Sequence, residues 1–81
     1  MQASTIEFHQ PLRARFLREG DVFEWLGVRY TADDDALPHE ALPGLLVVPL
    51  DIDGYSDFVL LPAERFVQLI HSLDLPSEVL L

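Results

Sequence analysis

The sequence predicts an α+β fold. We expect a small, twisted antiparallel sheet of four to five strands, either open or curled into a partly open barrel, with one amphipathic helix near the C-terminus. Two observations lead to this prediction. Segment 45–61 contains two short runs rich in Val and Leu on either side of an Asp-Gly turn signal, as in a β-hairpin. Segment 62–73 places its apolar residues on one side of a helical projection.

The register of the 45–61 hairpin follows from its turn. If Asp53 and Gly54 are the two central turn residues, apolar residues face each other on both sides of the strand pair. Both faces should then be covered, one by the helix and one by the N-terminal half. Pro49 has no N–H for a strand ladder, so we expect it at an edge, a bulge or a local break. The predicted pairs are Val48–Val59 and Leu46–Leu61 on one face and Val47–Leu60 on the other.

The helix is predicted from the spacing of apolar residues after Leu61. At about 100° per residue, the apolar side chains occupy one arc and the polar side chains the other. Pro62 suits the first helical position, although Leu61 is a poor N-cap. Pro76 disfavours a helical conformation in the residue before it, so the helix should end near Asp74. The apolar arc consists of Ala63, Phe66, Val67, Leu69, Ile70 and Leu73.

The N-terminal segment is predicted to form strands. In segment 5–9, Ile6 and Phe8 alternate with polar residues, as in a half-buried strand. Segment 11–19 fits either a strand or a short helix, and the alternation of apolar residues with arginine favours the strand. Gly20 and Asp21 would then form the turn that follows. The alternating residues are Leu12, Arg13, Ala14, Arg15 and Phe16.

Segment 21–32 is the second predicted hairpin. A turn at Leu26 and Gly27 gives a register with both an aromatic pair and a charge pair, which a shift of one residue would lose. Leu26 is not a favoured turn residue, so a looser loop is the alternative. Segment 33–44, which is rich in Asp and Pro, is predicted to be a loop. The expected pairs are Trp25–Val28, Phe23–Tyr30 and Glu24–Arg29.

Length and composition restrict the possibilities further. The chain has 81 residues, of which 49% are hydrophobic, and no cysteine. We expect one domain over residues 1–81, stabilised by packing and not by disulfides. No apolar run approaches the roughly 18 residues of a membrane span, and the start lacks the pattern of a secretory signal. We therefore expect a cytoplasmic protein without membrane association, whose apolar ending Val79–Leu81 packs on the domain.

Negative charge is concentrated in the second part of the chain. The formal net charge is -9, and residues 30–64 contain no Arg or Lys. Such a surface can simply keep a protein soluble and monomeric. It can also bind a basic partner, with aromatic residues as anchors. The candidate partner-binding residues are Asp33, Asp34, Asp35, Glu40, Asp51, Asp53, Tyr55 and Asp57.

From this acidic surface we predict a non-enzymatic protein-binding module, an inhibitor or adaptor that engages a basic surface of a partner protein. By analogy of class alone, such small acidic domains resemble phage-encoded or mobile-element inhibitors, including anti-CRISPR and antirestriction proteins. An extreme form would be a nucleic-acid mimic, with carboxylates in place of phosphates. We expect a monomer or weak homodimer.

Two alternative functions are considered. Arg13, Arg15 and Arg18 could contact nucleic acid as a regulator would, but a body of charge -9 opposes direct binding to a polyanion. We expect these arginines to pair with the neighbouring Glu19 and Asp21.

The second alternative is a small metal-dependent or hydrolytic domain. The acids of 51–57 suggest a calcium loop, but Pro62 stands where the loop needs a Glu. The histidines match no ligand spacing, and the serines match no nucleophile motif. We therefore expect no catalytic residue, metal or cofactor. These side chains are His9, His39, His71, Ser4, Ser56, Ser72 and Ser77.

Overall fold

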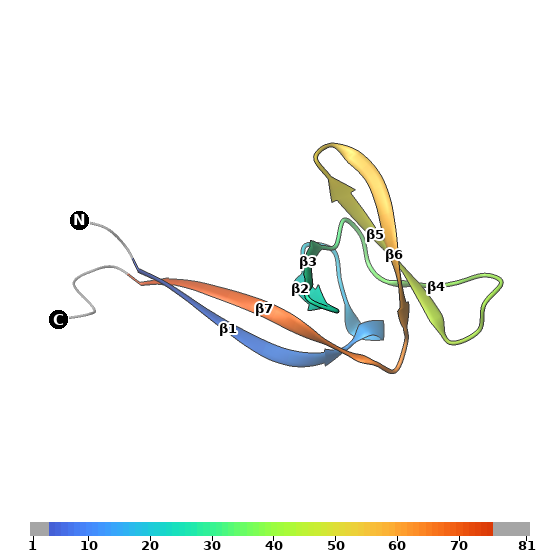
Figure 1. The fold of residues 1–81 in the computed structure, drawn as a ribbon, viewed down its shortest axis with the longest axis horizontal. Helices are drawn as coiled ribbons and strands as arrows, with labels where there is room; N and C mark the ends of the chain where they lie inside the picture. The colour runs from blue at the N-terminus through green and yellow to red at the C-terminus, as the bar shows by residue number, and fades with distance from the viewer. Residues whose placement is uncertain (1–3, 76–81) are drawn as a thin grey trace.

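The computed structural model describes residues 4–75, which form two antiparallel sheets (Figure 1). The first sheet has the strand order β1-β7-β2-β3 and the second has the order β4-β5-β6. The predicted α+β fold is therefore wrong, since the described chain is almost entirely β and its one helical element is a short 3₁₀ turn, η1. The expected packing of Val79–Leu81 lies outside the described residues. The elements are β1 (Ser4–Arg13), η1 (Ala14–Phe16), β2 (Val22–Trp25), β3 (Val28–Thr31), β4 (Leu37–Pro38), β5 (Leu45–Ile52), β6 (Tyr55–Pro62) and β7 (Phe66–Leu75).

The predicted C-terminal helix is instead strand β7. It pairs with the whole of β1, from Ser4 opposite Leu75 to Arg13 opposite Phe66, and its other edge pairs with β2. A lone helix of this length is marginally stable in water, whereas a strand between two others gains ladder bonds on both edges. Val67 is buried in either conformation, and it is 1% exposed in the strand. Pairing with β1 and β2 therefore decides the conformation of this segment against its helical pattern of apolar residues.

Both hairpin registers are confirmed. Strands β2 and β3 pair Trp25 with Val28 and Phe23 with Tyr30, and strands β5 and β6 show every pair expected from the Asp53-Gly54 turn. All four central turn residues have positive φ, as type I′ turns require. These φ values are 51° at Leu26, 80° at Gly27, 51° at Asp53 and 83° at Gly54.

Segment 11–19 is divided between the two alternatives. The strand predicted there continues only to Arg13, and η1 follows. At this point the partner strand has not yet begun, and the chain bonds to the turn before β7: the Ala14 N–H donates to the Arg65 carbonyl at 2.9 Å. The bend completely buries Ala14 and Leu17. Regular strand geometry ends because the chain turns inward to fill the core.

The two sheets share one hydrophobic core. They are connected where Ala32 bridges Leu50, and the Asp33 N–H donates to the Pro49 carbonyl at 2.8 Å. Pro49 lies beyond the end of β4, which covers only Leu46 and Val47, so its missing donor breaks no β4 bond. The core residues are Ala14, Leu17, Phe23, Ala32, Leu46, Val48, Leu50, Leu61 and Val67.

Only one face of the β5–β6 hairpin is covered, which corrects the expectation that both are. Leu46, Val48 and Leu61 face the core, and no helix covers the opposite face. Leu37, Val47 and Leu60 lie side by side across β4, β5 and β6 on that opposite face, where Leu60 is 38% and Leu37 53% exposed. Within residues 4–75, no helix has the length and apolar character to cross a membrane.

Candidate functional site: a groove between two strand edges

The predicted acidic residues fall into separate places. Asp51, Asp53 and Asp57 surround the tip of the β5–β6 hairpin, where Tyr55 is 78% exposed. Glu40 lies near the other end of β5, because the His39 N–H donates to the Leu45 carbonyl. Along an eight-residue strand these two ends are about 23 Å apart. The structure therefore groups the hairpin-tip residues and separates Glu40 from them.

The Asp triplet after β3 has partly structural roles. Asp35 is half-buried, and its Oδ1 accepts the Glu19 N–H at 2.9 Å, which fixes the loop to the turn before β2. Asp34 accepts the N–H of Asp35 at 2.7 Å. The Asp33 side chain is exposed, and its backbone is bonded to Pro49, so it lies at the junction of the sheets. Of the triplet, Asp33 is the residue placed beside β5.

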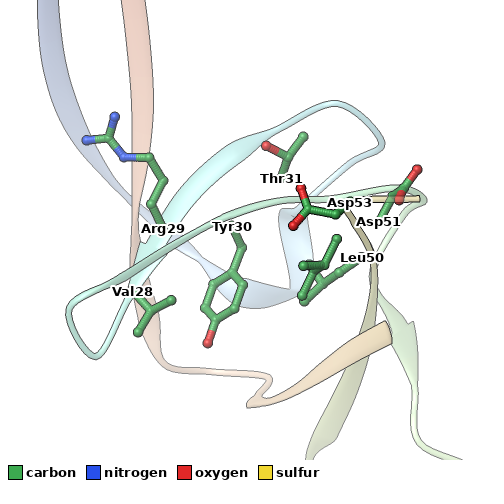
Figure 2. A pocket seen from close by; sticks show the side chains of 8 residues that line it. Val28, Arg29, Tyr30, Thr31, Leu50, Asp51 and Asp53 are labelled. Atoms are coloured by element: carbon green, nitrogen blue, oxygen red, sulfur yellow. The ribbon is translucent and has the colours of Figure 1, made fainter. Parts of the chain in front are cut away.

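A hollow of about 400 Å³ lies between β3 and the end of β5 (Figure 2). Four consecutive residues of each segment line it, so its walls are two strand edges that diverge from the Ala32–Leu50 bridge. We call this hollow the β3–β5 groove. The lining residues are Val28, Arg29, Tyr30, Thr31, Leu50, Asp51, Ile52 and Asp53.

Both strand edges at the groove have unpaired stretches. β3 is the last strand of its sheet, and β4 pairs with β5 only at Leu46 and Val47. The Leu26-Gly27 turn makes Trp25–Val28 a hydrogen-bonded pair, so by alternation Arg29 and Thr31 direct their backbone groups away from β2. These groups face the groove edge. An extended segment can therefore add to the edge of β3 through main-chain hydrogen bonds.

Negative charge at the groove is not cancelled by its own arginine. Arg29 donates from Nη2 to Glu7 Oε1 at 2.6 Å and from Nη1 to Glu7 Oε2 at 3.1 Å. Figure 2 shows its guanidinium directed toward β1 and β7, away from Asp51 and Asp53. Asp51 Oδ1 accepts the Gly54 N–H at 2.9 Å, which leaves its other oxygen outside the turn bond. The two carboxylates are thus placed to meet a cation in the groove.

The Arg29–Glu7 pair also changes the acidity of its members. The hydrogen bond from Arg29, followed by that from His9, lowers the pKa of Glu7 from 4.5 to about 2. The same bond raises the pKa of Arg29. Arg29 was expected to meet Glu24, and its backbone does pair with Glu24, but its side chain bonds to β1, two strands further away. The first sheet must curl for these strands to meet.

The N-terminal arginines do not form an independent basic strip. Arg13 and Arg15 both donate to Glu64, at 3.1 Å and 3.0 Å, and not to Glu19 or Asp21. Their guanidinium groups also lie over aromatic rings, 4.7 Å from the centre of Phe66 for Arg13 and 4.9 Å from that of Phe16 for Arg15. One carboxylate thus offsets part of the charge that a phosphate would need.

Comparison of the chain with protein-family models, curated proteins and solved structures finds no match. Function must therefore be inferred from the geometry of the chain itself. In the part of the chain that the structure describes, no three His, Asp or Glu side chains are arranged to hold a metal ion.

Sequence reasoning identified the hairpin tip but missed the groove. Tyr55 and the tip carboxylates follow from the Asp-Gly turn, which is a local signal. The opposite wall, Val28–Thr31, lies about twenty residues earlier and meets β5 only through the Ala32–Leu50 bridge. No periodicity in the sequence encodes that bridge. The Leu26-Gly27 turn and the aromatic and charge pairs that it aligns were the signals that β3 is a strand.

Proposed function

We propose that this protein is a non-enzymatic protein-binding module of the cytoplasm, an inhibitor or adaptor that captures an extended, basic segment of a partner protein in the β3–β5 groove. The groove supports the proposal because it combines two strand edges, unpaired beyond the Ala32–Leu50 bridge, with two carboxylates, Asp51 and Asp53. Main-chain bonds to an edge give affinity, and side-chain contacts give specificity. Four residues of each edge suit a bound stretch of about four residues, roughly 13 Å long.

The chemistry of the groove favours Arg or Lys in the bound segment. Ile52 and Val28 offer apolar surface to the aliphatic part of such a side chain, and the carboxylates can accept hydrogen bonds from its charged end. The absence of Arg and Lys between residues 30 and 64 leaves these carboxylates without a competing cation nearby in sequence. Tyr55 at the hairpin tip can add an aromatic anchor at the rim.

The experiment compares four baits in pull-downs from cells of the native host. They are the wild-type chain, the charge-neutral double variant Asp51→Asn/Asp53→Asn, the edge variant Thr31→Pro and the control Glu40→Gln. Asn keeps the Asp51 acceptor and tolerates the positive φ of Asp53, so the turn is preserved. Pro at position 31 removes a donor that faces the groove and no β2–β3 bond.

A true partner should bind the wild-type and Glu40→Gln baits and be lost from the other two. With the isolated partner, the double Asp variant should weaken binding by at least about tenfold, and added salt should weaken wild-type binding steeply. Equal loss with Glu40→Gln would show a response to total charge and not to the groove. Retention by Thr31→Pro would exclude strand addition at the β3 edge.

A further inference from the structure

The outer half of the β1–β7 ribbon extends away from the rest of the molecule (Figure 1). Strand β2 pairs with β7 only at Gln68 and Leu69. From Ile70 to Leu75, and from Ser4 to His9 opposite, the described part of the chain is a sheet of two strands. This ribbon gives the molecule a longest dimension of 54 Å against 28 and 19 Å in the other directions.

The two faces of this ribbon differ in chemistry. Ile6 and Leu73 are cross-strand partners on one face and are 44% and 50% exposed. Phe8 is 49% exposed on the same face, where its ring stacks on His71 with the ring centres 5.3 Å apart. Gln10 and Leu69 complete this face, which contains no Asp or Glu among residues 5–74 of the two strands. We call it the uncharged ribbon face.

The opposite face carries the charge. Glu7 and Asp74 project there, and Asp74 accepts a hydrogen bond from Thr5 at 2.9 Å. Strand alternation thus separates an uncharged face from an acidic one. By the same alternation, the uncharged ribbon face continues the side on which Val67 enters the core. A core-facing pattern therefore extends past the end of the core.

The exposed surface of this chain is larger than that of a compact monomer of the same mass. A two-stranded ribbon is marginally stable alone in water. A compact monomer of 9.2 kDa exposes about 4,900 Å². This chain exposes 5822 Å², so the excess is roughly 900 Å². The radius of gyration is 15.2 Å, whereas a compact chain of 81 residues has about 12 Å. A standard interface buries about 800 Å² on each partner, so one contact of that size would bring the exposed area of the whole chain close to the compact value.

We infer that a second copy of this chain packs its uncharged ribbon face against this one, so that the protein is a twofold-symmetric homodimer. The two faces are identical, as a twofold contact requires, and apart from the hydrogen-bonded Gln10 and His71 their described side chains are apolar. The turn of the β5–β6 hairpin and the outer end of the β1–β7 ribbon project from the rest of the molecule in different directions (Figure 1), so the acidic residues of the hairpin tip are not part of the contact. A second copy of the chain is also available to cover this exposed face wherever the protein is made. This surface is distinct from the β3–β5 groove.

Sedimentation equilibrium of the full chain tests the inference. The wild-type protein should have twice the 9.2 kDa chain mass at micromolar concentration. Phe8→Lys should shift it to the monomer, with the dissociation constant of the dimer raised at least tenfold. Thr5→Lys is the matched control: it makes the same charge change on the same strand but on the acidic face, next to Asp74, and should remain a dimer.

A second measurement does not depend on a disruptive variant. The chain has no cysteine, so Ile6→Cys introduces a single thiol on the uncharged ribbon face and Tyr55→Cys a single thiol at the hairpin tip. Mild oxidation should link Ile6→Cys chains into covalent dimers much faster than Tyr55→Cys chains. A monomeric wild-type protein, or a dimer that crosslinks equally well at Tyr55→Cys, would overturn the inference, whichever other molecule or segment then covers the ribbon.

Discussion

At the scale of single residues, the two hairpin turns use unlike residues for the same backbone conformation. Leu26 and Asp53 both have φ of 51°. Asp tolerates the left-handed region because its short polar side chain can bond locally, whereas an ordinary side chain such as Leu is strained there. Leu26 is also 81% exposed, so burial does not offset the strain. The first hairpin is therefore closed by a turn that its sequence only partly favours.

Replacing Leu26 by Asn should stabilise the protein. Asn-Gly is the preferred pair for a type I′ turn, and relief of the strain should raise the free energy of unfolding by up to about 1 kcal/mol. Urea denaturation of the variant and the wild type measures this change. Leu42→Asn is the control, because Leu42 is 47% exposed without positive φ and should show no gain. A loss of stability in Leu26→Asn would mean that Leu26 makes a contact outside the turn.

Glu7 should make stability depend on pH in acid. Its pKa is about 2 in the folded chain, lowered mainly by the hydrogen bond from Arg29, against 4.5 ordinarily. A depressed carboxyl pKa stabilises the fold above about pH 4.5, and that contribution is lost as the pH falls toward 2. Urea midpoints of the wild type should therefore fall more steeply across this window than those of Glu7→Gln. Parallel pH profiles would show that the pair does not persist in solution.

At the scale of elements, the sequence predicts what local turns determine. Asp53-Gly54 and Leu26-Gly27 are two-residue turns, and each fixes the register of a hairpin whose strands are adjacent in sequence. The strand β7 has no such turn to its partner, because β1 lies more than fifty residues earlier. Its apolar residues share one arc of a helix, whereas in the strand Val67, Leu69 and Leu73 lie on one face and Phe66 and Ile70 on the other. The decision depends on long-range pairing, which one sequence does not display.

A substitution at Gln68 should separate strand from helix in solution. Gln68 is exposed on β7 and lies opposite both Pro11 and Glu24. Thr has a higher β propensity than Gln and a lower helix propensity. Gln68→Thr should therefore raise the free energy of unfolding by a few tenths of a kcal/mol in urea titrations. A decrease of about 0.5 kcal/mol is the result that a helix would give.

The two faces of β6 should respond very differently to truncation. Leu61 is fully buried in the core, whereas its neighbour Leu60 is 38% exposed on the uncovered face. Leu61→Ala should lower the free energy of unfolding by about 2 to 5 kcal/mol, since it leaves a cavity, and Leu60→Ala by less than about 1 kcal/mol. Chemical denaturation of both variants gives the comparison. Similar losses would indicate that the outer face is also covered in solution, for instance in an assembly.

The groove shows the same limit of sequence reasoning at the level of function. Its acidic wall, Asp51–Asp53, was predicted as part of an acidic surface that also included Glu40. In the fold these residues lie apart: Asp35 accepts a hydrogen bond from the Glu19 N–H, and Glu40 lies near the far end of β5. The bridge between Ala32 and Leu50 then supplies the second wall. The sequence therefore predicted the acidic residues of the groove but not which residues lie together around it.

At the scale of the whole molecule, attractive and repulsive charges compete. Arg13 and Arg15 share Glu64, and Arg29 bonds to Glu7, but the side chains of all three ion pairs are substantially exposed. Exposed pairs contribute between 0 and about 1 kcal/mol each. Against them stands a net charge of -9, whose self-repulsion favours the expanded chain. Most of the uncompensated acids lie after Arg29, in the half that holds the second sheet.

Added salt should therefore stabilise this protein. Salt screens both the attraction within ion pairs and the repulsion among carboxylates. The long-range repulsion is screened more completely than ion-pair contacts of about 3 Å. Between about 0.02 and 0.5 M NaCl we expect the Tm to rise by several degrees, the shift that about 1 kcal/mol produces in a domain of this size. Thermal denaturation at constant protein concentration measures it, because a dimer also responds to concentration. With Glu64→Gln, which removes the carboxylate shared by Arg13 and Arg15, the rise should persist. A fall in Tm with salt would instead mean that the few ion pairs outweigh the net charge.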